Sequence, residues 1–343
     1  MSNSFDPNAA AEADAGLFGL PCTPDESRVV VLPVPWAATT SYGGGAELGP
    51  ETILAASRQV DLFDLETGRP YEGGIAMLPI PTDIVALHDA ARVDALRVIE
   101  AGGQVGGDRE LAEALLRVNA ASARVNAWVY EQASRWLRAG KRIAVVGGDH
   151  STPFGAIRAV AETVPTMGIL HIDAHADLRY AYEGFEHSHA SIMRNVYDRI
   201  PSIARIVQVG IRDFCEDEFE FIRASHRRVV TYFDNDLARE QADGVAWTTI
   251  VDRIVGELPM DVYVSFDVDG LDPSLCPHTG TPVPGGLTYR DACQLLRGVV
   301  RSGRRIVAVD VNEVAPGPEG DEWDGNVGAR LLYKMIGWMV AKS

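Results

Sequence analysis

Residues 167–177 have the sequence MGILHIDAHAD and give the clearest indication of the fold. Its first part, Met167–Ile172, is almost entirely apolar without alternation, which is typical of a strand buried on both faces of a parallel sheet. Asp173, His175 and Asp177 follow directly, separated by alanines. If the chain stays extended, these three side chains face one side, where two carboxylates repel each other unless a cation lies between them. A solvated acidic loop with a surface histidine is the alternative.

Similar apolar runs occur along the rest of the chain and alternate with helix-like stretches. The other predicted strands are Arg28–Pro33, Arg142–Val146, Ile206–Val209, Asp261–Phe266 and Ile306–Val309. Helical spacing covers Arg109–Leu137 and Tyr289–Ser302, with Thr288 as a candidate N-cap, and Ala101–Asp108 is predicted to be a loop or a broken helix. This alternation predicts an α/β protein with a mostly parallel sheet, in which ligands bind beyond the C-terminal ends of the strands.

Two further strand ends carry polar clusters. Gly147-Gly148-Asp149-His150-Ser151 follows one strand, and its glycines allow a tight turn that places His150 at the strand end. A glycine turn that merely caps the next helix would look the same. Asp267 and Asp269 follow Asp261–Phe266 and also share a face, although an Asp-rich β-turn is an alternative there.

Taken together, the three clusters predict a metal centre. They supply four aspartates and two histidines, namely His150, Asp173, His175, Asp177, Asp267 and Asp269. A mixed nitrogen and oxygen set suits Mn²⁺, Ni²⁺ or Zn²⁺ better than Ca²⁺ or Mg²⁺. Six ligands are too many for one catalytic zinc and fit two metals that share carboxylates. Such binuclear sites generate a bridging hydroxide near neutral pH, which favours hydrolysis.

Composition excludes several classes of protein. The 343 residues include 31 basic and 48 acidic side chains, a net charge of −17, which argues against nucleic acid and anionic membranes as partners and suits a cationic ligand. No apolar run approaches the roughly 18 residues of a membrane span. The four cysteines form no C-x-x-C pair, and the N-terminus lacks the features of a signal peptide. We therefore expect a cytoplasmic protein.

The motifs resemble those of the ureohydrolase family of arginases and agmatinases. They are GGDHS at Gly147–Ser151, DAHAD at Asp173–Asp177, SFDVDGLDP at Ser265–Pro273, TTSYGGGAELGPETI at Thr39–Ile53, TGTPVPGGL at Thr279–Leu287 and DVNEVAP at Asp310–Pro316. The resemblance spans about Val29 to Met339. It implies a three-layer α/β/α, arginase-like fold, a single ureohydrolase domain at 28–343 after an N-terminal arm at 1–27, and a homotrimer or homohexamer.

The resemblance also implies roles for individual residues. His150, Asp173, Asp177 and Asp267 would bind one metal ion, and Asp173, His175, Asp267 and Asp269 the other. His189 matches the family's proton-shuttle histidine, Glu313 the acid that pairs with the substrate guanidinium, and Thr281 a threonine that lines the same pocket. The bridging hydroxide would attack the guanidinium carbon, and the expected cofactors are two divalent ions per chain, Mn²⁺ or Ni²⁺.

Alternatives remain for some of these residues. His187 lies two residues before His189 and either could be a surface histidine, while Glu313 could be a structural carboxylate. We expect His171 to support the metal ligands rather than bind metal. The three remaining histidines are predicted to lie on the surface: His88, His226 and His278.

The substrate is less well determined by the sequence. The loop Leu178–His187 (LRYAYEGFEH) contains Tyr180, Tyr182 and Phe185 and one basic residue, Arg179. These rings either pack the loop or form a tight pocket that disfavours arginine. The resemblance is closest to the agmatinase-like branch, which includes nickel-dependent guanidine hydrolases, so guanidine, agmatine, guanidinobutyrate, another alkyl guanidine and biguanide are candidate substrates.

Other functions are weighed against this one. An arginase and a formimidoylglutamase-type hydrolase remain alternatives, as does a deacetylase-like enzyme, which would need only one metal. A non-catalytic partner subunit would usually have lost a ligand, and none of the six is missing. The acidic loop Gly317–Asp324, which includes Trp323, could border either the site or a subunit contact.

Overall fold

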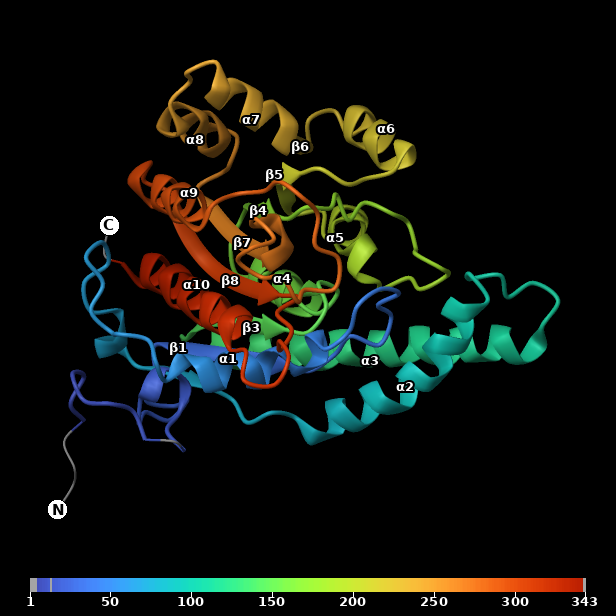
Figure 1. Cartoon of the computed structure of the whole chain (residues 1–343), viewed down its shortest axis with the longest axis horizontal. Helices are drawn as coiled ribbons and strands as arrows, with labels where there is room; N and C mark the ends of the chain where they lie inside the picture. Colours follow the sequence, from blue (N-terminus) through green and yellow to red (C-terminus); the bar gives the residue numbers. More distant parts are fainter. Residues whose placement is uncertain (1–4, 13, 342–343) are drawn as a thin grey trace.

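A parallel eight-stranded sheet forms the centre of the molecule (Figure 1). The computed structural model describes residues 5–12 and 14–341. The strand order is β2-β1-β3-β8-β7-β4-β5-β6, and every neighbouring pair is parallel. The strands are β1 (Val29–Val34), β2 (Ile75–Met77), β3 (Arg142–Gly147), β4 (Met167–Ile172), β5 (Ile203–Ile211), β6 (Val229–Phe233), β7 (Asp261–Asp267) and β8 (Arg305–Asn312).

Helices cover both faces of the sheet and produce the predicted three layers. One face packs against α1 (Gly49–Ser57), α7 (Asp234–Ala242), α8 (Trp247–Gly256), α9 (Tyr289–Arg301) and α10 (Trp323–Val340). The opposite face packs against α2 (Thr82–Glu100), α3 (Arg109–Arg138), α4 (Phe154–Ala161), α5 (Ile192–Arg199) and α6 (Glu216–Ala224).

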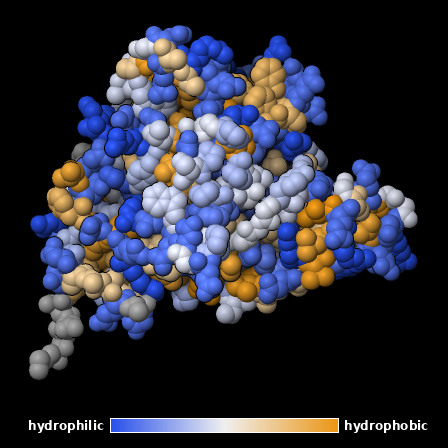
Figure 2. Space-filling view, viewed as in Figure 1, coloured by the Kyte–Doolittle hydropathy of each residue, from blue (hydrophilic) through white to orange (hydrophobic). Residues whose placement is uncertain are grey.

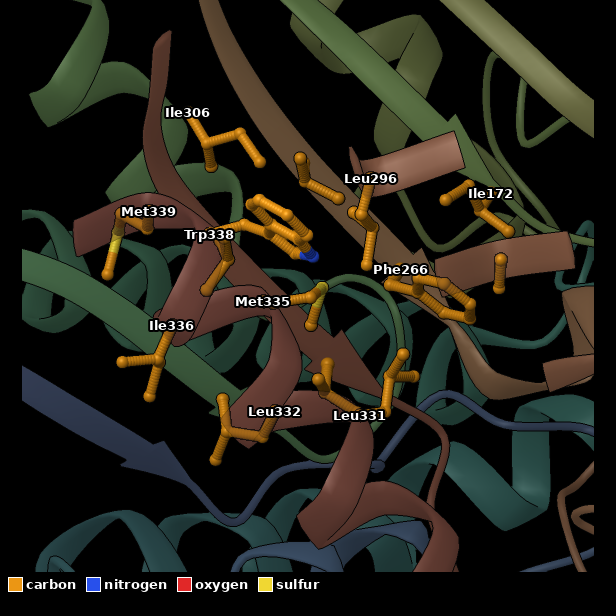
Figure 3. Packing of buried hydrophobic residues seen from close by; sticks show 14 of the residues in the cluster. Ile172, Phe266, Leu296, Ile306, Leu331, Leu332, Met335, Ile336, Trp338 and Met339 are labelled. Carbon is orange, nitrogen blue, oxygen red and sulfur yellow. The ribbon is translucent and has the colours of Figure 1, made fainter. Parts of the chain in front are cut away.

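Burial on both faces explains why the strands show no alternation of apolar and polar residues. In β1, Val29 and Val31 pack on the side of α10, whereas Val30 and Leu32 pack on the side of α3. Figure 3 shows how side chains of α10 fill the space above β7 and β8, with Trp338 among them. Fully burying one such aliphatic side chain contributes about 1.5–3 kcal/mol, so this double-sided core holds the strand ends in place.

The predicted elements agree with the structure except at the edges of the sheet. Thr288 caps α9, with its hydroxyl accepting from the Asp291 amide at 3.1 Å. The sequence analysis missed β2, which has three residues, and β6, four of whose five residues are only half-buried. Edge strands pair on one side only, so their sequences need not be continuously apolar.

The helices α2 and α3 form a long hairpin that extends beyond the sheet, which we call the α2–α3 arm (Figure 1). The predicted break at Ala101–Asp108 is its turn, and Asp108 caps α3 by accepting from the amides of Glu110 and Leu111. In the mostly polar surface of Figure 2, apolar side chains gather on this arm. Those exposed there are Val93, Leu96 and Leu116.

Part of the predicted N-terminal arm packs on the domain. Residues 1–4 and 13 of that segment lie outside the described residues. Leu17 and Phe18 are buried, and the Phe18 ring meets Tyr333 of α10 at a centroid distance of 4.8 Å. The Phe18 amide donates to the Ser57 hydroxyl at 3.0 Å. None of the helices in the described part of the chain is long and apolar enough to span a bilayer.

Candidate active site

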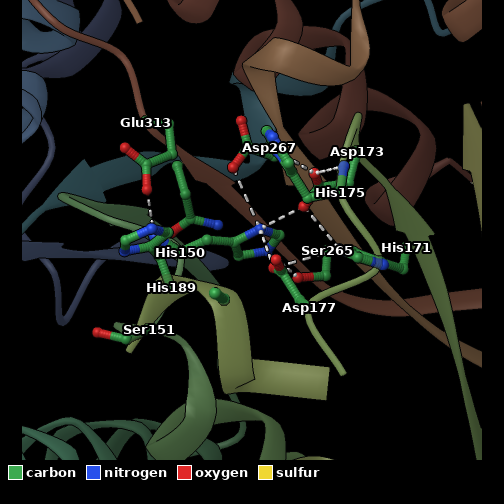
Figure 4. Close-up of polar contacts among 12 residues, drawn as sticks. His150, Ser151, His171, Asp173, His175, Asp177, His189, Ser265, Asp267 and Glu313 are labelled. Atoms are coloured by element: carbon green, nitrogen blue, oxygen red, sulfur yellow. Dashed lines mark hydrogen bonds and ion pairs between the residues drawn. The ribbon is translucent and has the colours of Figure 1, made fainter. Parts of the chain in front are cut away.

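The predicted metal residues meet at the C-terminal ends of three strands in the centre of the sheet, β3, β7 and β4, and Glu313 follows the fourth strand of this group, β8. The order β3-β8-β7-β4 brings together segments that are far apart in sequence. Figure 4 shows side chains from these strand ends pointing toward one another. Gly148 allows the turn after β3, because a Cβ there would lie 2.0 Å from the Trp36 carbonyl oxygen. Gly148 is therefore required by a close chain crossing, and a Cβ on Gly147 would collide with the side chains of Asn312 and Thr152.

One cluster surrounds the His150 imidazole. Its Nδ1 lies 3.0 Å from Asp173 Oδ2, 3.3 Å from Asp267 Oδ2 and 3.5 Å from Asp177 Oδ2. All four side chains are buried. Three carboxylate oxygens therefore converge on one ring nitrogen, which is the donor set that the resemblance implies for the first ion.

A second cluster lies beside it. His175 Nδ1 is 3.0 Å from Asp269 Oδ2 and 3.5 Å from Asp173 Oδ1. Asp269 is held in turn by the Ala174 amide, which donates to its Oδ1 at 3.0 Å. Asp173 thus offers one carboxylate oxygen to each cluster.

Two residues of the site have left-handed backbone conformations. Asp177 has φ of 55° and Glu313 has φ of 64°. Sequence analysis expected Asp177 to share a face with Asp173 through a continuous extended chain; instead the chain bends at Ala174, and Asp177 reaches the cluster through its unusual backbone. Such conformations cost about 1–3 kcal/mol each in non-glycine residues and are typical of functional sites.

Burial makes the charge of this cluster costly. It raises the pKa of Asp177 and Asp267 well above the usual value. The neighbouring Asp173 raises both pKa values further, and Asp269 also raises that of Asp267. Asp177 Oδ2 is buried and forms no hydrogen bond among the described residues. Divalent cations would remove this repulsion and give that oxygen a partner, so the residues present fit a pair of metal ions.

A layer of polar side chains fixes the ligands from behind. Gln208 donates to His171 Nδ1 at 3.0 Å, so the His171 proton lies on Nε2 and is donated to Asp173 Oδ2 at 2.8 Å. Burial also lowers the pKa of His171. His150 Nε2 is 2.9 Å from the Ser265 hydroxyl, which donates to Asp310 Oδ1 at 3.1 Å.

The roles of several supporting residues were not predicted from the sequence. Gln208, Ser265 and Asp310 are each flanked on both sides by apolar residues of a buried strand, and that could have identified them. Arg212 was also missed: its guanidinium donates to the carbonyl oxygens of Asp269 at 2.6 Å and Val283 at 3.0 Å. It thereby joins the end of β5 to the loop that contains the predicted ligand Asp269.

A cavity of about 430 Å³ opens onto the clusters at His175 and Asp177. Its other walls include Tyr182, His189 and Thr281. Its remaining lining residues are Tyr42, Arg179, Ala190, Asp213, Phe214, Glu218, Gly280, Pro282 and Val283.

Only one of the three predicted pocket rings lines this cavity. Tyr182 does so, whereas Tyr180 is 76% exposed and Phe185 is fully buried elsewhere. Both interpretations of the loop were therefore partly right, because one ring forms the pocket and another packs the loop.

Glu313 and Thr281 lie beside the clusters. The Glu313 carboxylate accepts from the His150 amide at 2.9 Å, and burial together with Asp267 raises its pKa well above the usual value. It is not part of the cavity lining and lies behind Gly280. The Thr281 hydroxyl donates to Asp269 Oδ2 at 3.3 Å.

The two neighbouring histidines occupy different environments. His189 lines the cavity, and burial together with His175 lowers its pKa to about 4. His187 points away and accepts from Arg199 at 3.1 Å next to the Phe154 ring. His189 is therefore next to the space where a substrate would bind, and His187 is buried rather than a surface residue.

We expect His187 to make stability pH-dependent. Burial and then Arg199 lower its folded pKa to about 4, below the unfolded value, so the unfolded chain binds more protons in this range. Its contribution is present above about pH 6.5 and is lost as the pH falls toward 4. Chemical denaturation of the wild type and of His187→Gln between pH 4 and 7 measures this, and an equal pH slope for the two proteins would contradict it.

Other surface predictions need correction. His88 is buried because α2 packs it against Trp36, at a ring distance of 6.0 Å. His278 is half-buried and pairs with the buried Asp324 at 2.9 Å. His226 is exposed, as predicted. Trp323 begins α10 with 48% of its surface exposed and does not line the cavity.

Comparison with known proteins identifies the class. The Arginase family model matches residues 27–337, and the chain belongs to this family. It is 37% identical to the N(1)-aminopropylagmatine ureohydrolase of Thermus thermophilus, covering 94% of both chains. It is 33% identical to the agmatinase of Cronobacter sakazakii, over 92% of this chain and 89% of the other. The protein is therefore an agmatinase-like ureohydrolase, a hydrolase of C–N bonds in amidines.

Solved structures show the same fold. Proclavaminate amidinohydrolase from Streptomyces clavuligerus superposes with a TM-score of 0.72 at 24% identity, over 97% of this chain and 99% of the other. The agmatine ureohydrolase of Thermoplasma volcanium gives a TM-score of 0.69 at 24% identity, over 93% and 92%. The predicted arginase-like α/β/α fold is confirmed.

Proposed function

We propose that this chain hydrolyses a small alkyl guanidine to urea and an amine, with two divalent ions bound by the paired clusters. The observation that carries the proposal is Asp173, whose two carboxylate oxygens face His150 and His175 respectively. Asp267, Asp177 and Asp269 would complete the set. Manganese and nickel both suit these nitrogen and oxygen donors.

Residues of the chain would transfer the proton and bind the guanidinium. Two bound ions would supply a water of lowered pKa and a Lewis acid beside the cavity. His189 is neutral at pH 7, because burial lowers its pKa to about 4. A group of such low basicity would hold a proton only transiently, so its proposed role is to relay a proton to the leaving nitrogen. The buried Glu313 carboxylate, which lies next to Gly280 of the cavity wall, would pair with the guanidinium, and Thr281 of the same wall donates to Asp269.

Charge favours substrates with a cationic tail. The cavity wall carries the carboxylates of Asp177, Asp213 and Glu218 against one basic side chain, Arg179. Arg179 lies 3.7 Å from Glu218, so these two charges compensate each other, and the bound ions would compensate Asp177. Asp213 is then the uncompensated charge of the wall. It would repel a carboxylate on the substrate, as in arginine or guanidinobutyrate, and attract the amine of agmatine. The relative named N(1)-aminopropylagmatine ureohydrolase agrees with this charge preference.

Urea release from a panel of guanidino compounds tests the proposal. With Mn²⁺ or Ni²⁺ restored, agmatine should exceed guanidinobutyrate and arginine in kcat/KM by at least about tenfold, since like charges in contact are strongly disfavoured. Guanidine is included as the substrate without a tail. Asp213→Asn should reduce the agmatine value by no more than about fivefold, because Asp213 is exposed. Arginine or guanidinobutyrate as the best substrate would disprove the charge argument.

The cytoplasmic location and the homotrimer or homohexamer stay predictions from the sequence, as does the division into an N-terminal arm and one domain at residue 28.

A further inference from the structure

The hairpin that follows Asp177 has a fixed turn. Tyr182 and Phe185 pair through two backbone hydrogen bonds of 3.2 and 2.8 Å. The two residues between them, Glu183 and Gly184, have φ of 52° and 87°. Positive φ at both positions defines a type I′ turn, which sets the register of a two-residue hairpin. The hairpin therefore has one defined geometry at its tip.

The α2–α3 arm holds one ring of this hairpin. Phe185 is fully buried in a cluster of its own, separate from the clusters that cover the sheet. Its buried neighbours are Ala95 and Val98 of α2 and Ala114 and Val118 of α3. The ring is thus an anchor in the arm and not in the main core.

Polar contacts from the same arm hold the backbone of the hairpin. The Asn119 side chain of α3 donates to the Gly184 carbonyl at 3.1 Å and accepts from the Glu186 amide at 3.0 Å. At the turn of the arm, a Cβ on Gly103 would lie 2.8 Å from the Glu183 Cα, so the two backbones are in contact. Both ends of the turn are therefore fastened to the arm.

The other ring of the hairpin faces the substrate cavity. Tyr182 lines the cavity, and its ring centroid lies 6.1 Å from that of His189. The Arg179 guanidinium lies over the same ring, 5.1 Å from its centroid. Tyr182 is thus a wall residue next to both the proton-shuttle candidate and the one basic side chain of the cavity.

We propose that the α2–α3 arm sets the range of guanidino compounds that the site accepts, by holding Tyr182 as a fixed wall. This inference rests on the proposed function. A fixed wall contacts a slender substrate and excludes a bulky substituent, whereas a mobile hairpin does neither. Phe185 and Asn119 are positioning residues in this scheme, because they act only through Tyr182.

Steady-state kinetics on agmatine and benzylguanidine test the proposal. Phe185→Ala and Asn119→Ala should raise the KM for agmatine about tenfold with kcat within about threefold, since remote changes act by misplacing contacts. The kcat/KM ratio of benzylguanidine to agmatine should rise in both variants and most in Tyr182→Ala. Tyr182→Phe should keep the wild-type ratio. Leu116→Ala, on the same helix but 68% exposed, is the control.

Amide hydrogen exchange tests whether the arm holds the hairpin without relying on turnover. Amides of residues 182–186 should exchange faster in Phe185→Ala and Asn119→Ala than in the wild type. Their exchange rates in Leu116→Ala should equal those of the wild type. If the wild type hydrolyses neither compound, the proposed function fails, while exchange still decides whether the arm holds the hairpin. An unchanged substrate ratio in Tyr182→Ala, or unchanged exchange in both arm variants, would overturn the inference.

Discussion

Asp173→Asn is expected to reduce urea release by more than about 10³-fold, because the substitution weakens both halves of the metal centre at once. Asp173 Oδ2 faces His150 and Asp173 Oδ1 faces His175. Asparagine keeps the shape but removes the charge and one acceptor oxygen. Elemental analysis after loading with Mn²⁺ or Ni²⁺ should find fewer than two ions per chain.

Asp272→Asn is the matched control for this prediction. Asp272 follows β7, the strand that also carries Asp267, but it is partly exposed, and among the described residues its Oδ1 accepts from the amide and hydroxyl of Ser274. It should retain wild-type metal content and turnover. Two ions per chain together with undiminished activity in Asp173→Asn would refute the shared-ligand scheme.

Glu313→Gln is expected to reduce kcat/KM for agmatine by about 10²- to 10³-fold, as when one partner of a buried ion pair is removed. Glu313 is 5% exposed, and its one hydrogen bond among the described residues comes from the His150 amide. Glutamine can still accept that bond, so the backbone of the metal ligand should be preserved. What is lost is the negative charge opposite the guanidinium.

Metal content distinguishes this loss from damage to the metal centre. Glu313→Gln should hold as much metal as the wild type, unlike Asp173→Asn, and its thermal unfolding midpoint should be at least as high, because burial raises the pKa of this carboxyl group. Activity within about threefold of the wild type would mean that Glu313 has only a structural role.

The meeting of the candidate metal residues at one edge of the sheet could be predicted from the sequence, because these residues follow apolar runs directly. A run such as Met167–Ile172 predicts a buried parallel strand, and side chains at the ends of parallel strands lie at one edge of the sheet. Which strands are neighbours could not be predicted, since the order β3-β8-β7-β4 depends on how the helices pack. The contacts of Ser265 with His150 and Asp310 follow from that order.

The cavity was harder to predict than the metal residues. Tyr180, Tyr182 and Phe185 are indistinguishable as aromatic loop residues, yet they are respectively exposed, in the cavity wall and fully buried. Their positions depend on the direction in which the α2–α3 arm leaves the sheet. Helical spacing predicts a helix and its apolar face but not what that face meets. His88 was misplaced for the same reason.

The position of the α2–α3 arm outside the central layers has an evolutionary consequence. Mutations in its apolar cluster around Phe185 can change the position of the Tyr182 side chain. The strand ends that bear the carboxylates stay unchanged. Substitutions in the α2–α3 arm could thus change which guanidino compounds are accepted during evolution, without changing the residues at the strand ends.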